Sequence, residues 1–483
     1  MLTYRMRHWW SCSSIAAQIQ SVEVKFQPPL REQRRTWVLD VLRRESVTSA
    51  LDVGCGEGVL LHHLTHTTPW RAYSSSTPAP AVFEKPDLIH IREMHGLDIV
   101  HDDLLYAVNI TEPPKLAYDW TRFEELNVSI WEGGLQKPNP TFKGIDCIVA
   151  TEVIEHLPED VLTSFAPILL GNYAPRLLLL TTPSYDYNAC FSAPGDRKWG
   201  YPDPTLRTDR VFRHDDHKFE WTVDECVAWC RAVAADWGYE VIIDGIGRST
   251  TKDPWGRDGG KVRASQAVTF RRREGDEWAT RRATRYAEWA SGRVDGGQPH
   301  KLLATHHYEA HAAAEKPASR EDIVAAIKIA IQNIGAVDVT ILELWREEPT
   351  SSACGGWLEV LVDVLEQDTS FVVHKEGKDA ADWVVELPGV EVRGRGPWQD
   401  VWAQNSEATE DDDESFDDDE YSEKSSDDDE EDQDEAEDTA EVTIASEWTT
   451  TEDGGCGTES ESILKSWAEW KPVPGWFEEC SWD

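Results

Sequence analysis

The stretch Leu51-Asp52-Val53-Gly54-Cys55-Gly56-Glu57-Gly58 decides the fold of this chain of 483 residues. The apolar pattern over residues 47–53 predicts a short buried strand. The glycines that follow predict a tight turn, because glycine adopts positive φ angles and lets a ligand approach the backbone closely. Residues 59–65 suit the helix after the turn. A strand, a glycine-rich turn and a helix in this order are typical of ligand sites at the strand ends of α/β sheets.

Strand and helix patterns alternate as far as residue 273, which predicts a mostly parallel sheet covered by helices on both faces. Residues 67–93 are rich in Ser, Thr and Pro and indicate an insertion. The sequence therefore predicts a doubly wound α/β domain. Further strands are expected at 94–99, 128–131, 145–150, 176–181, 239–243 and 265–270, and further helices at 102–108 and 223–237.

The rest of the chain divides by composition. Residues 274–320 are charged and rich in alanine, which predicts a helical linker, and 321–334 have helical periodicity. Residues 337–344 and 357–364 read as strands of a small unit of unknown role. We predict five regions: an N-terminal segment (1–36), the catalytic domain (37–275), a linker with the small unit (276–403), a disordered acidic run (404–445) and a Trp-rich tail (446–483).

The net charge of −43 is unevenly distributed. Residues 1–273 hold 31 Lys and Arg against 36 Asp and Glu, whereas residues 407–441 hold 22 acidic residues and one Lys. A run of this composition cannot bury enough apolar surface to fold. The acidity of the whole chain therefore does not exclude a nucleic-acid substrate for the first half.

Bulk features also exclude several classes of protein. The nine cysteines form no CxxC pair, which argues against a zinc ribbon or a disulfide framework. The first 18 residues lack a continuous apolar core, and no run of about 18 apolar residues is present, so neither a secretory signal nor a membrane span is predicted. We expect a soluble, monomeric protein of the cytoplasm, with the nucleus as the alternative.

The glycines at 54, 56 and 58 do not form the dinucleotide-binding GxGxxG pattern. An acid followed by GxG instead resembles motif I of class I methyltransferases, whose loop holds S-adenosylmethionine. This resemblance implies a Rossmann-like sheet, with Asp52, Gly54 and Gly56 at the cofactor. Asp98 ends the second strand, where it can accept hydrogen bonds from ribose hydroxyls or cap the next helix. Gly133 is a candidate near the adenine. For the glycine loop, a structural turn or a site for another nucleotide is the alternative.

A second group of polar residues follows the fourth strand. If a helix begins there, Glu152, Glu155 and His156 lie at positions i, i+3 and i+4 on one face. Two carboxylates and an imidazole suit Mg²⁺ or Mn²⁺, although a solvated acidic helix face is the alternative. Residues 212–222 form another cluster of potential ligands, in which composition alone does not choose between His214 and His217.

These residues resemble a known family, the small-RNA 3′-terminal 2′-O-methyltransferases of plant microRNA and animal piRNA pathways. Glu152-x-x-Glu155-His156 resembles the family's metal motif, and residues 216–222, Asp-His-Lys-Phe-Glu-Trp-Thr, match its DHKFEWT block. Residues 26–34 are similar to its FxPPLxxQR motif. The stretch 182–188 departs from a TPNxExN pattern at Ser184 and Asp186. The resemblance covers just under half of the chain.

The resemblance implies methyl transfer from S-adenosylmethionine to the 2′-hydroxyl at the 3′ end of a single-stranded or duplex small RNA. Mg²⁺ or Mn²⁺ would lower the pKa of that hydroxyl, and His217 becomes the fourth ligand in place of His214. The implied roles are metal ligation by Glu152, Glu155, His156 and His217, and proton transfer by His156 or His217. The family's FxPPLxxQR motif lies near the RNA end, which makes Phe26, Pro28, Pro29 and Arg34 candidate RNA contacts. By residue type, Arg34, Arg35, Arg213 and Lys218 are candidate phosphate partners and Phe26 could stack on a base, with surface charge or a core aromatic as the alternative for each.

An Argonaute protein that presents the RNA is the expected partner, and no membrane is involved. Two alternatives remain from the sequence. A class I methyltransferase of proteins or small molecules would leave the two metal clusters unused. A catalytically inactive scaffold would have lost ligand positions, yet all four are present.

Overall fold

The computed structural model describes eight stretches of the chain. The predicted insertion, for the most part, and the acidic and Trp-rich regions lie outside the described residues, as do residues 1–23. In the part that is described, no helix is long and apolar enough to cross a membrane. The described residues are 24–66, 89–114, 121–195, 200–257, 262–293, 297–336, 338–375 and 383–389.

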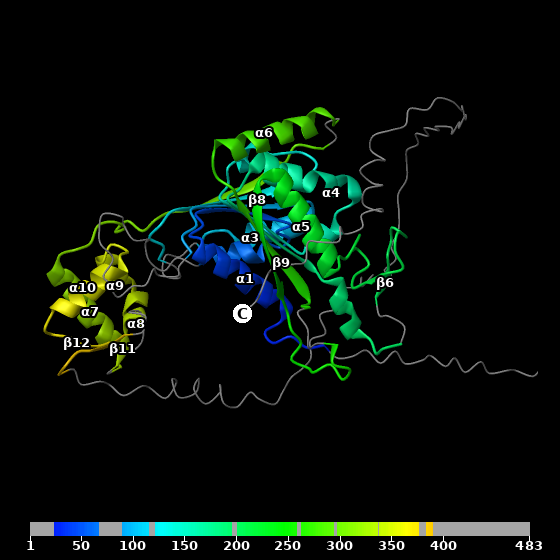
Figure 1. Cartoon of the computed structure of the whole chain (residues 1–483). Helices are drawn as coiled ribbons and strands as arrows, with labels where there is room; N and C mark the ends of the chain where they lie inside the picture. The colour runs from blue at the N-terminus through cyan, green and yellow to red at the C-terminus, as the bar shows by residue number, and fades with distance from the viewer. Residues whose placement is uncertain are drawn as a thin grey trace, which may run out of the picture. The chain divides into compact units, whose positions relative to one another are not determined.

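An eight-stranded sheet with the order β10-β3-β2-β1-β4-β5-β9-β8 forms the centre of the fold (Figure 1). Strands β3, β2, β1, β4 and β5 pair in parallel, whereas β9 is antiparallel to both of its neighbours and β10 is antiparallel to β3. The strands are β1 (Ser49–Val53), β2 (Glu93–Asp98), β3 (Leu126–Glu132), β4 (Cys147–Thr151), β5 (Leu177–Pro183), β8 (Tyr239–Ile246), β9 (Ser265–Arg272) and β10 (Lys301–Tyr308).

Helices cover both faces of this sheet, because its central strands are apolar on both sides. One buried cluster joins α1, α2 and α3 to the sheet, and another joins α4, α5 and a π-helical turn to the opposite face. The predicted doubly wound α/β fold is confirmed. The helices are α1 (Leu30–Arg44), α2 (Val59–Thr65), α3 (His101–Ile110), α4 (Glu159–Ala166), α5 (Val223–Trp237) and α6 (Asp276–Ser291); the π-helical turn is η3 (Pro167–Tyr173).

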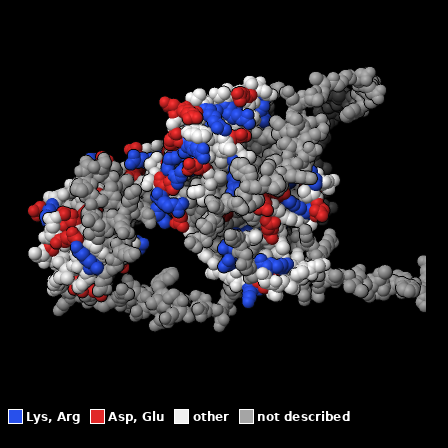
Figure 2. All heavy atoms as spheres, in the orientation of Figure 1, with Lys and Arg blue, Asp and Glu red and all other residues white. Residues whose placement is uncertain are grey.

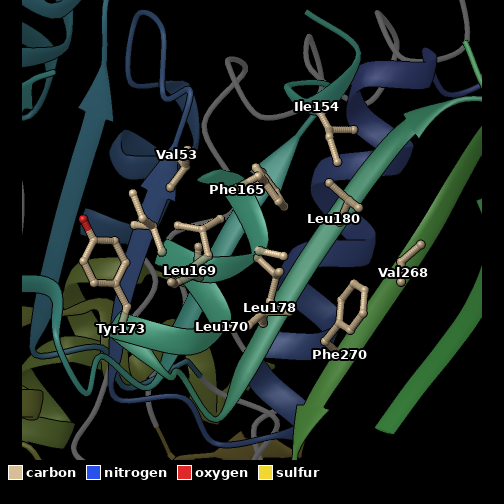
Figure 3. Close-up of a cluster of buried hydrophobic side chains, with 14 of the residues drawn as sticks. Val53, Ile154, Phe165, Leu169, Leu170, Tyr173, Leu178, Leu180, Val268 and Phe270 are labelled. Atoms are coloured by element: carbon tan, nitrogen blue, oxygen red, sulfur yellow. The ribbon is translucent and has the colours of Figure 1, made fainter. Parts of the chain in front are cut away.

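Strand β5 shows why the sheet is stable. All seven of its residues are buried, as expected for a central strand with helices on both faces. Leu178 and Leu180 lie beside Val268 and Phe270 of β9 in the buried cluster drawn in Figure 3. Each buried leucine side chain contributes roughly 1.5–3 kcal/mol by leaving water. This core holds the carboxyl ends of the strands in fixed positions.

The sheet extends past residue 275, where the sequence predicted that the catalytic domain ends. Helix α6 packs against η3 and α5, and β10 pairs with β3 along the sheet edge. The predicted linker therefore contributes an edge strand to the sheet. Alternation along β10 is weak, with half-buried and exposed residues intermixed, which explains why its pattern did not predict a strand.

The small unit after residue 310 has its own apolar core, to which Phe123 also contributes. The predicted helix at 321–334 is confirmed as α7. The strand predicted at 357–364 is wrong, because α10 buries Leu358, Leu361 and Leu365 at helical spacing. Of the described residues 338–344, only Val339 and Thr340 form a strand, and Thr340 also caps helix α8. The elements are α7 (Arg320–Ile334), β11 (Val339–Thr340), α8 (Ile341–Arg346), α9 (Glu348–Ala353), α10 (Leu358–Gln367), β12 (Val372–His374) and β13 (Val384–Glu386).

Candidate active site

The candidate site lies at the carboxyl ends of β1, β2, β4 and β5. Strand β1 is flanked by β2 on one side and β4 on the other, so the chain crosses over in opposite directions from this strand. Loops diverge at such a switch point and leave room for a ligand. The glycine loop follows β1, and the predicted metal motif follows β4.

The glycine loop adopts the conformation that its sequence predicts. Gly54, Gly56 and Gly58 have φ angles of 70°, 49° and 80°, which favour glycine over residues with a Cβ atom. The loop also contacts the metal motif directly, since a Cβ atom on Gly54 would lie 2.4 Å from Cγ2 of Val153. The two motifs are therefore packed against each other, although Gly54 and Val153 are 99 positions apart in the chain.

Two acids lie beside this loop, the buried Asp52 in β1 and the half-buried Asp98 at the end of β2. The backbone N–H of Gly56 donates to Oδ2 of Asp98 (2.9 Å), and those of Ile99 and Val100 donate to Oδ1 (2.6 and 3.0 Å). Asp98 thus holds the loop and the backbone that leads into α3. Asp52 is 5% exposed. Its burial, together with the nearby charge of Asp98, raises its pKa to about 8.

Gly133 lies after β3, beside a residue that the sequence did not single out. A Cβ atom on Gly133 would lie 2.4 Å from Cδ2 of His300, and Nε2 of His300 is 2.9 Å from the carbonyl oxygen of Gly134. His300 enters this region because β10 pairs with β3. Nothing in its local sequence marks it, so only the sheet topology reveals that it neighbours the predicted adenine region.

Glu155, His156 and His217 come together as one cluster, with a potential ligand atom of each within 4.8 Å of the others. The carboxylate of Glu155 is fully buried. Thr182 donates to its Oε2 (3.0 Å), while Oε1 has no hydrogen-bond partner. Burial and the nearby Glu152 raise the pKa of Glu155 well above its ordinary value. A buried carboxylate with an unpaired oxygen beside two imidazoles fits a cation site.

Carboxylates orient both imidazoles of this cluster. Nδ1 of His217 lies 2.7 Å from Oε1 of Glu220, and Nδ1 of His156 lies 3.0 Å from Oδ2 of Asp216. A proton on Nδ1 that is shared with a carboxylate leaves Nε2 with its lone pair available. Burial lowers the pKa of His156 despite the neighbouring Asp216, which favours the neutral, ligating form of the imidazole.

Glu152 is placed differently from the other predicted ligands. The expected helix after β4 is wrong, because Glu152 has a φ of 53°, a short 3-10 turn spans Ile154–His156, and α4 begins only at Glu159. Thr181 donates to one oxygen of Glu152 (2.8 Å), and Arg34 forms an ion pair with the other (3.2 Å). Glu152 therefore borders the cluster without joining it.

Glu220 connects the cluster to residues that sequence reasoning had not placed in it. Its Oε2 accepts a hydrogen bond from Asn188 (2.5 Å), and its Oε1 accepts one from the backbone of Arg213 (2.6 Å). Burial opposes the ionisation of Glu220, yet the bonds from His217 and Arg213 keep its pKa below the ordinary value. Glu220 and Asn188 lie in the stretches 216–222 and 182–188, which were compared with the family. That resemblance was the available signal in the sequence.

Two of the predicted RNA contacts are engaged within the protein. Arg34 pairs with Glu152, as described above. The half-buried Arg213 donates to Oδ1 of Asn188 (2.6 Å) and to the carbonyl oxygen of Ser184 (2.8 Å), so its guanidinium holds the site together. Both arginines thus have partners within the protein, and their roles as phosphate contacts stay predictions. The sequence could not show this, because the bonding partners of Arg213 lie 25 and 29 residues away.

The other predicted contacts lie at the surface or near it. Pro28 and Pro29 are exposed, and Arg35 and Lys218 are half-buried. The half-buried ring of Phe26 lies 6.1 Å from that of Tyr187. Their roles in RNA binding stay predictions.

Comparison with known proteins supports the resemblance. The chain is 30% identical over 222 residues to the small RNA 2′-O-methyltransferase of Xenopus tropicalis, which covers 46% of this chain and 50% of that protein. It is 29% identical over 252 residues to the protein of the same name from Arabidopsis thaliana, and this match covers 51% of the present chain and 23% of that protein. The resemblance predicted from the motifs is thereby confirmed. The chain spans about half the length, or less, of these curated relatives.

Comparison with family models and with solved structures gives no further support for a family assignment. No protein-family model matches the chain. Among solved structures, the small RNA methyltransferase HEN1 aligns at 24% identity with a TM-score of 0.39, covering 59% of this chain and 28% of that one. The methyltransferase domain of a bacterial Hen1 aligns at 24% identity with a TM-score of 0.35, covering 51% and 100%.

Proposed function

We propose that the chain is an S-adenosylmethionine-dependent methyltransferase that modifies the 2′-hydroxyl of the 3′-terminal nucleotide of a small RNA, and that it requires Mg²⁺ or Mn²⁺. The observation that carries this proposal is the buried, unpartnered Oε1 of Glu155 beside His156 and His217. The close packing of this cluster on the glycine loop through Val153 supports the same conclusion. The names of the relatives supply the class of substrate.

The residues of the cluster fit a hard divalent cation. Glu155 would hold it through Oε1, and the two histidines through Nε2, since their Nδ1 atoms face carboxylates. Glu152 would join after a small movement of its side chain away from Arg34. When bound, the cation lowers the pKa of the ribose 2′-hydroxyl and orients it for attack.

The glycine loop would hold the methionine part of S-adenosylmethionine. Its backbone is open at Gly56, where a Cβ atom would meet no other atom within 4 Å. Asp98 would accept hydrogen bonds from the ribose of the cofactor, exchanging its present bond from Gly56 for these. Contact between the loop and Val153 would bring the methyl group close to the metal motif.

The transfer is a displacement at the methyl carbon. The 2′-oxygen forms the new bond, the sulfonium–methyl bond breaks, and S-adenosylhomocysteine leaves as a neutral thioether. The 2′-hydroxyl loses one proton. Either His156 or His217 could accept it through Nε2 while the other histidine and Glu155 hold the cation. The half-exposed His156 would pass the proton to solvent. The lone pair of one Nε2 serves either ligation or proton transfer at a given moment.

The test is methyl transfer to defined RNA ends. The full chain is incubated with labelled S-adenosylmethionine and a 22-nucleotide RNA, single-stranded or duplex, with Mn²⁺, with Mg²⁺ or with EDTA. A matched RNA carries a 2′-deoxy 3′ terminus, and periodate resistance reports where the methyl group is. We expect labelling that depends on metal and on the 2′-hydroxyl.

Labelling of the deoxy-ended RNA would overturn the proposed site of modification, and labelling in EDTA would overturn the metal requirement. Labelling of a protein or small molecule in place of RNA would favour the alternative class I methyltransferase. Cofactor binding without any transfer would favour a scaffold. Presentation of the RNA by an Argonaute protein is a further proposal from the resemblance. A monomeric state and a location in the cytoplasm, and also in the nucleus, are further proposals from the sequence.

A further inference from the structure

The loop between β8 and β9 carries an exposed aromatic residue, Trp255, with 47% of its surface accessible. This loop packs against the segment that bears the proline motif. The backbone N–H and the hydroxyl of Thr250 both donate to the carbonyl oxygen of Lys25 (2.7 and 3.2 Å). Ser249 donates its backbone N–H to the hydroxyl oxygen of Tyr187 (3.1 Å). The loop is thus fixed to the edge of the candidate site.

The position of the Trp255 ring is set by a neighbouring arginine. The guanidinium of Arg257 lies 4.8 Å from the centre of the ring. Arg257 is itself held by two bonds from its side chain to Asp253 (2.7 and 3.0 Å) and by bonds to the carbonyl oxygens of Ser192 (2.7 Å) and Ala189. Asp253 is only 6% exposed. The exposed ring is therefore ordered before any ligand binds, which lowers the entropic cost of binding.

The surroundings of the ring are basic. Lys25, Arg248 and Lys252 are exposed on the same loop and the adjoining segment. Figure 2 shows Lys and Arg side chains gathered at this lower end of the sheet. Within residues 247–257, Trp255 is the one large apolar side chain that is strongly exposed. A single ring among cations suits a nucleic acid better than an apolar protein surface.

A continuous series of contacts leads from this loop to the metal cluster. Tyr187 contacts the loop through Ser249 and lies beside the ring of Phe26. The guanidinium of Arg213 lies 6.0 Å from the ring centre of Tyr187, and its backbone supports Glu220, which orients His217. Tyr187, Glu220 and His217 are buried, so these contacts connect the loop to the cluster through the interior. Strands β4, β5 and β8 run in the same direction, so the loop after β8 and the cluster after β4 lie at the same end of the sheet. An RNA whose 3′ end lies at the cluster would extend along this end of the sheet toward Trp255.

We propose that Trp255 is a stacking platform for an unpaired nucleobase on the 5′ side of the 3′-terminal nucleotide, with the surrounding cations contacting the phosphates. Aromatic rings stack on any base, so the contact would add affinity without sequence preference. The inference rests on the proposed function, because it assumes that the 3′ end lies at the metal cluster. It adds a substrate-binding residue that touches RNA away from the reacting atoms.

The test combines protein variants with abasic RNA. Wild type, Trp255→Ala and Trp255→Phe are compared on a single-stranded 22-nucleotide RNA and on RNAs with one abasic site, moved stepwise from the 3′ end. Methyl transfer gives KM and kcat, and fluorescence anisotropy of 5′-labelled RNA gives Kd. Trp278→Ala is the matched control, since Trp278 also stacks against arginines, Arg273 and Arg281, but on helix α6.

We expect Trp255→Ala to raise KM and Kd about tenfold with little change in kcat. Trp255→Phe should retain most of the affinity, and the control should match wild type. One abasic position should weaken wild type but not Trp255→Ala, because the same stack is already lost. Unchanged Kd in Trp255→Ala, or equal losses in both proteins at every abasic position, would overturn the proposal. Absence of transfer by wild type would contradict the proposed function alone, because Kd still reports the stack.

Discussion

The glycine loop and the metal cluster lie side by side, yet they differ in how their polar groups are satisfied. In the loop, the backbone N–H groups of Gly54, Gly56 and Gly58 all have acceptors, and Asp98 accepts three hydrogen bonds. In the cluster, the buried Glu155 keeps one oxygen without a partner. The loop is complete as a folded structure, whereas the cluster keeps one carboxyl oxygen without a partner, to which a cation would bind under the proposed function.

The largest effect is expected from Glu155→Gln, which keeps the shape of the side chain but removes its charge. Methyl transfer should fall about a thousandfold or more, because cation binding is lost. Binding of S-adenosylmethionine to the loop should be unchanged. Transfer rates and cofactor titrations check both statements, with the partly exposed Glu159→Gln as the control. Near-normal transfer by Glu155→Gln would show that the cluster does not depend on the charge of Glu155. The contrast with the glycine loop would then not hold.

A smaller effect is expected from Glu220→Gln, which alters the partner that orients His217. An amide can offer its N–H to Nδ1 and so favour the tautomer with the proton on Nε2. Affinity for Mn²⁺ should fall about 10- to 100-fold, with the affinity for S-adenosylmethionine preserved. Titration of Mn²⁺ measures the change. An unaltered Mn²⁺ affinity would mean that the bond from Glu220 does not tune the cluster.

The glycine loop can be tested by a matched pair of substitutions. Gly54→Ala combines a positive φ with a contact 2.4 Å from Val153, whereas Gly56→Ala has the positive φ but open space. Urea unfolding should show a loss of about 2–4 kcal/mol for Gly54→Ala and about 1 kcal/mol for Gly56→Ala. Equal losses would show that the contact between the loop and the metal motif is unimportant for folding.

The last effect concerns the dependence of stability on pH. Because the pKa of Asp52 is raised to about 8 in the folded chain from an ordinary value near 3.8, the folded state binds the proton more tightly. The contribution of Asp52 to stability is complete below about pH 4 and is lost as the pH rises to about 8. Asp52→Asn should flatten the fall in Tm between pH 5 and pH 9, while the exposed Asp40→Asn should not. If Tm falls with pH as steeply in Asp52→Asn as in wild type, the raised pKa of Asp52 would be contradicted.

The sheet and the glycine loop could be predicted because local pattern determines them. Short apolar runs mark β1 and β5, and the positive φ angles of the turn favour the glycines at 54, 56 and 58. The metal motif was located correctly, but its backbone was not. Pro158 was the available signal, since a residue before proline disfavours the helical conformation and α4 begins directly after it.

Other features depend on contacts between distant segments, which local pattern does not contain. The bond of Glu220 to His217 lies within one motif, but Arg34 reaches Glu152 across 118 residues, and His300 reaches Gly133 only through the pairing of β10. The apolar residues of 357–364 are compatible with both the strand repeat and the helix repeat. They fit a strand by alternation, yet burial of Leu358, Leu361 and Leu365 against α7 and its neighbours selects the helix.

The most direct test of the contrast between the two regions is Mn²⁺ binding followed by electron paramagnetic resonance, on the full chain without RNA or S-adenosylmethionine. The account predicts a site that binds Mn²⁺ in wild type and in Asp98→Asn, and that is lost in Glu155→Gln. Mn²⁺ binding that persists in Glu155→Gln, or that disappears in Asp98→Asn, would contradict the assignment of Glu155, His156 and His217 as the cation site.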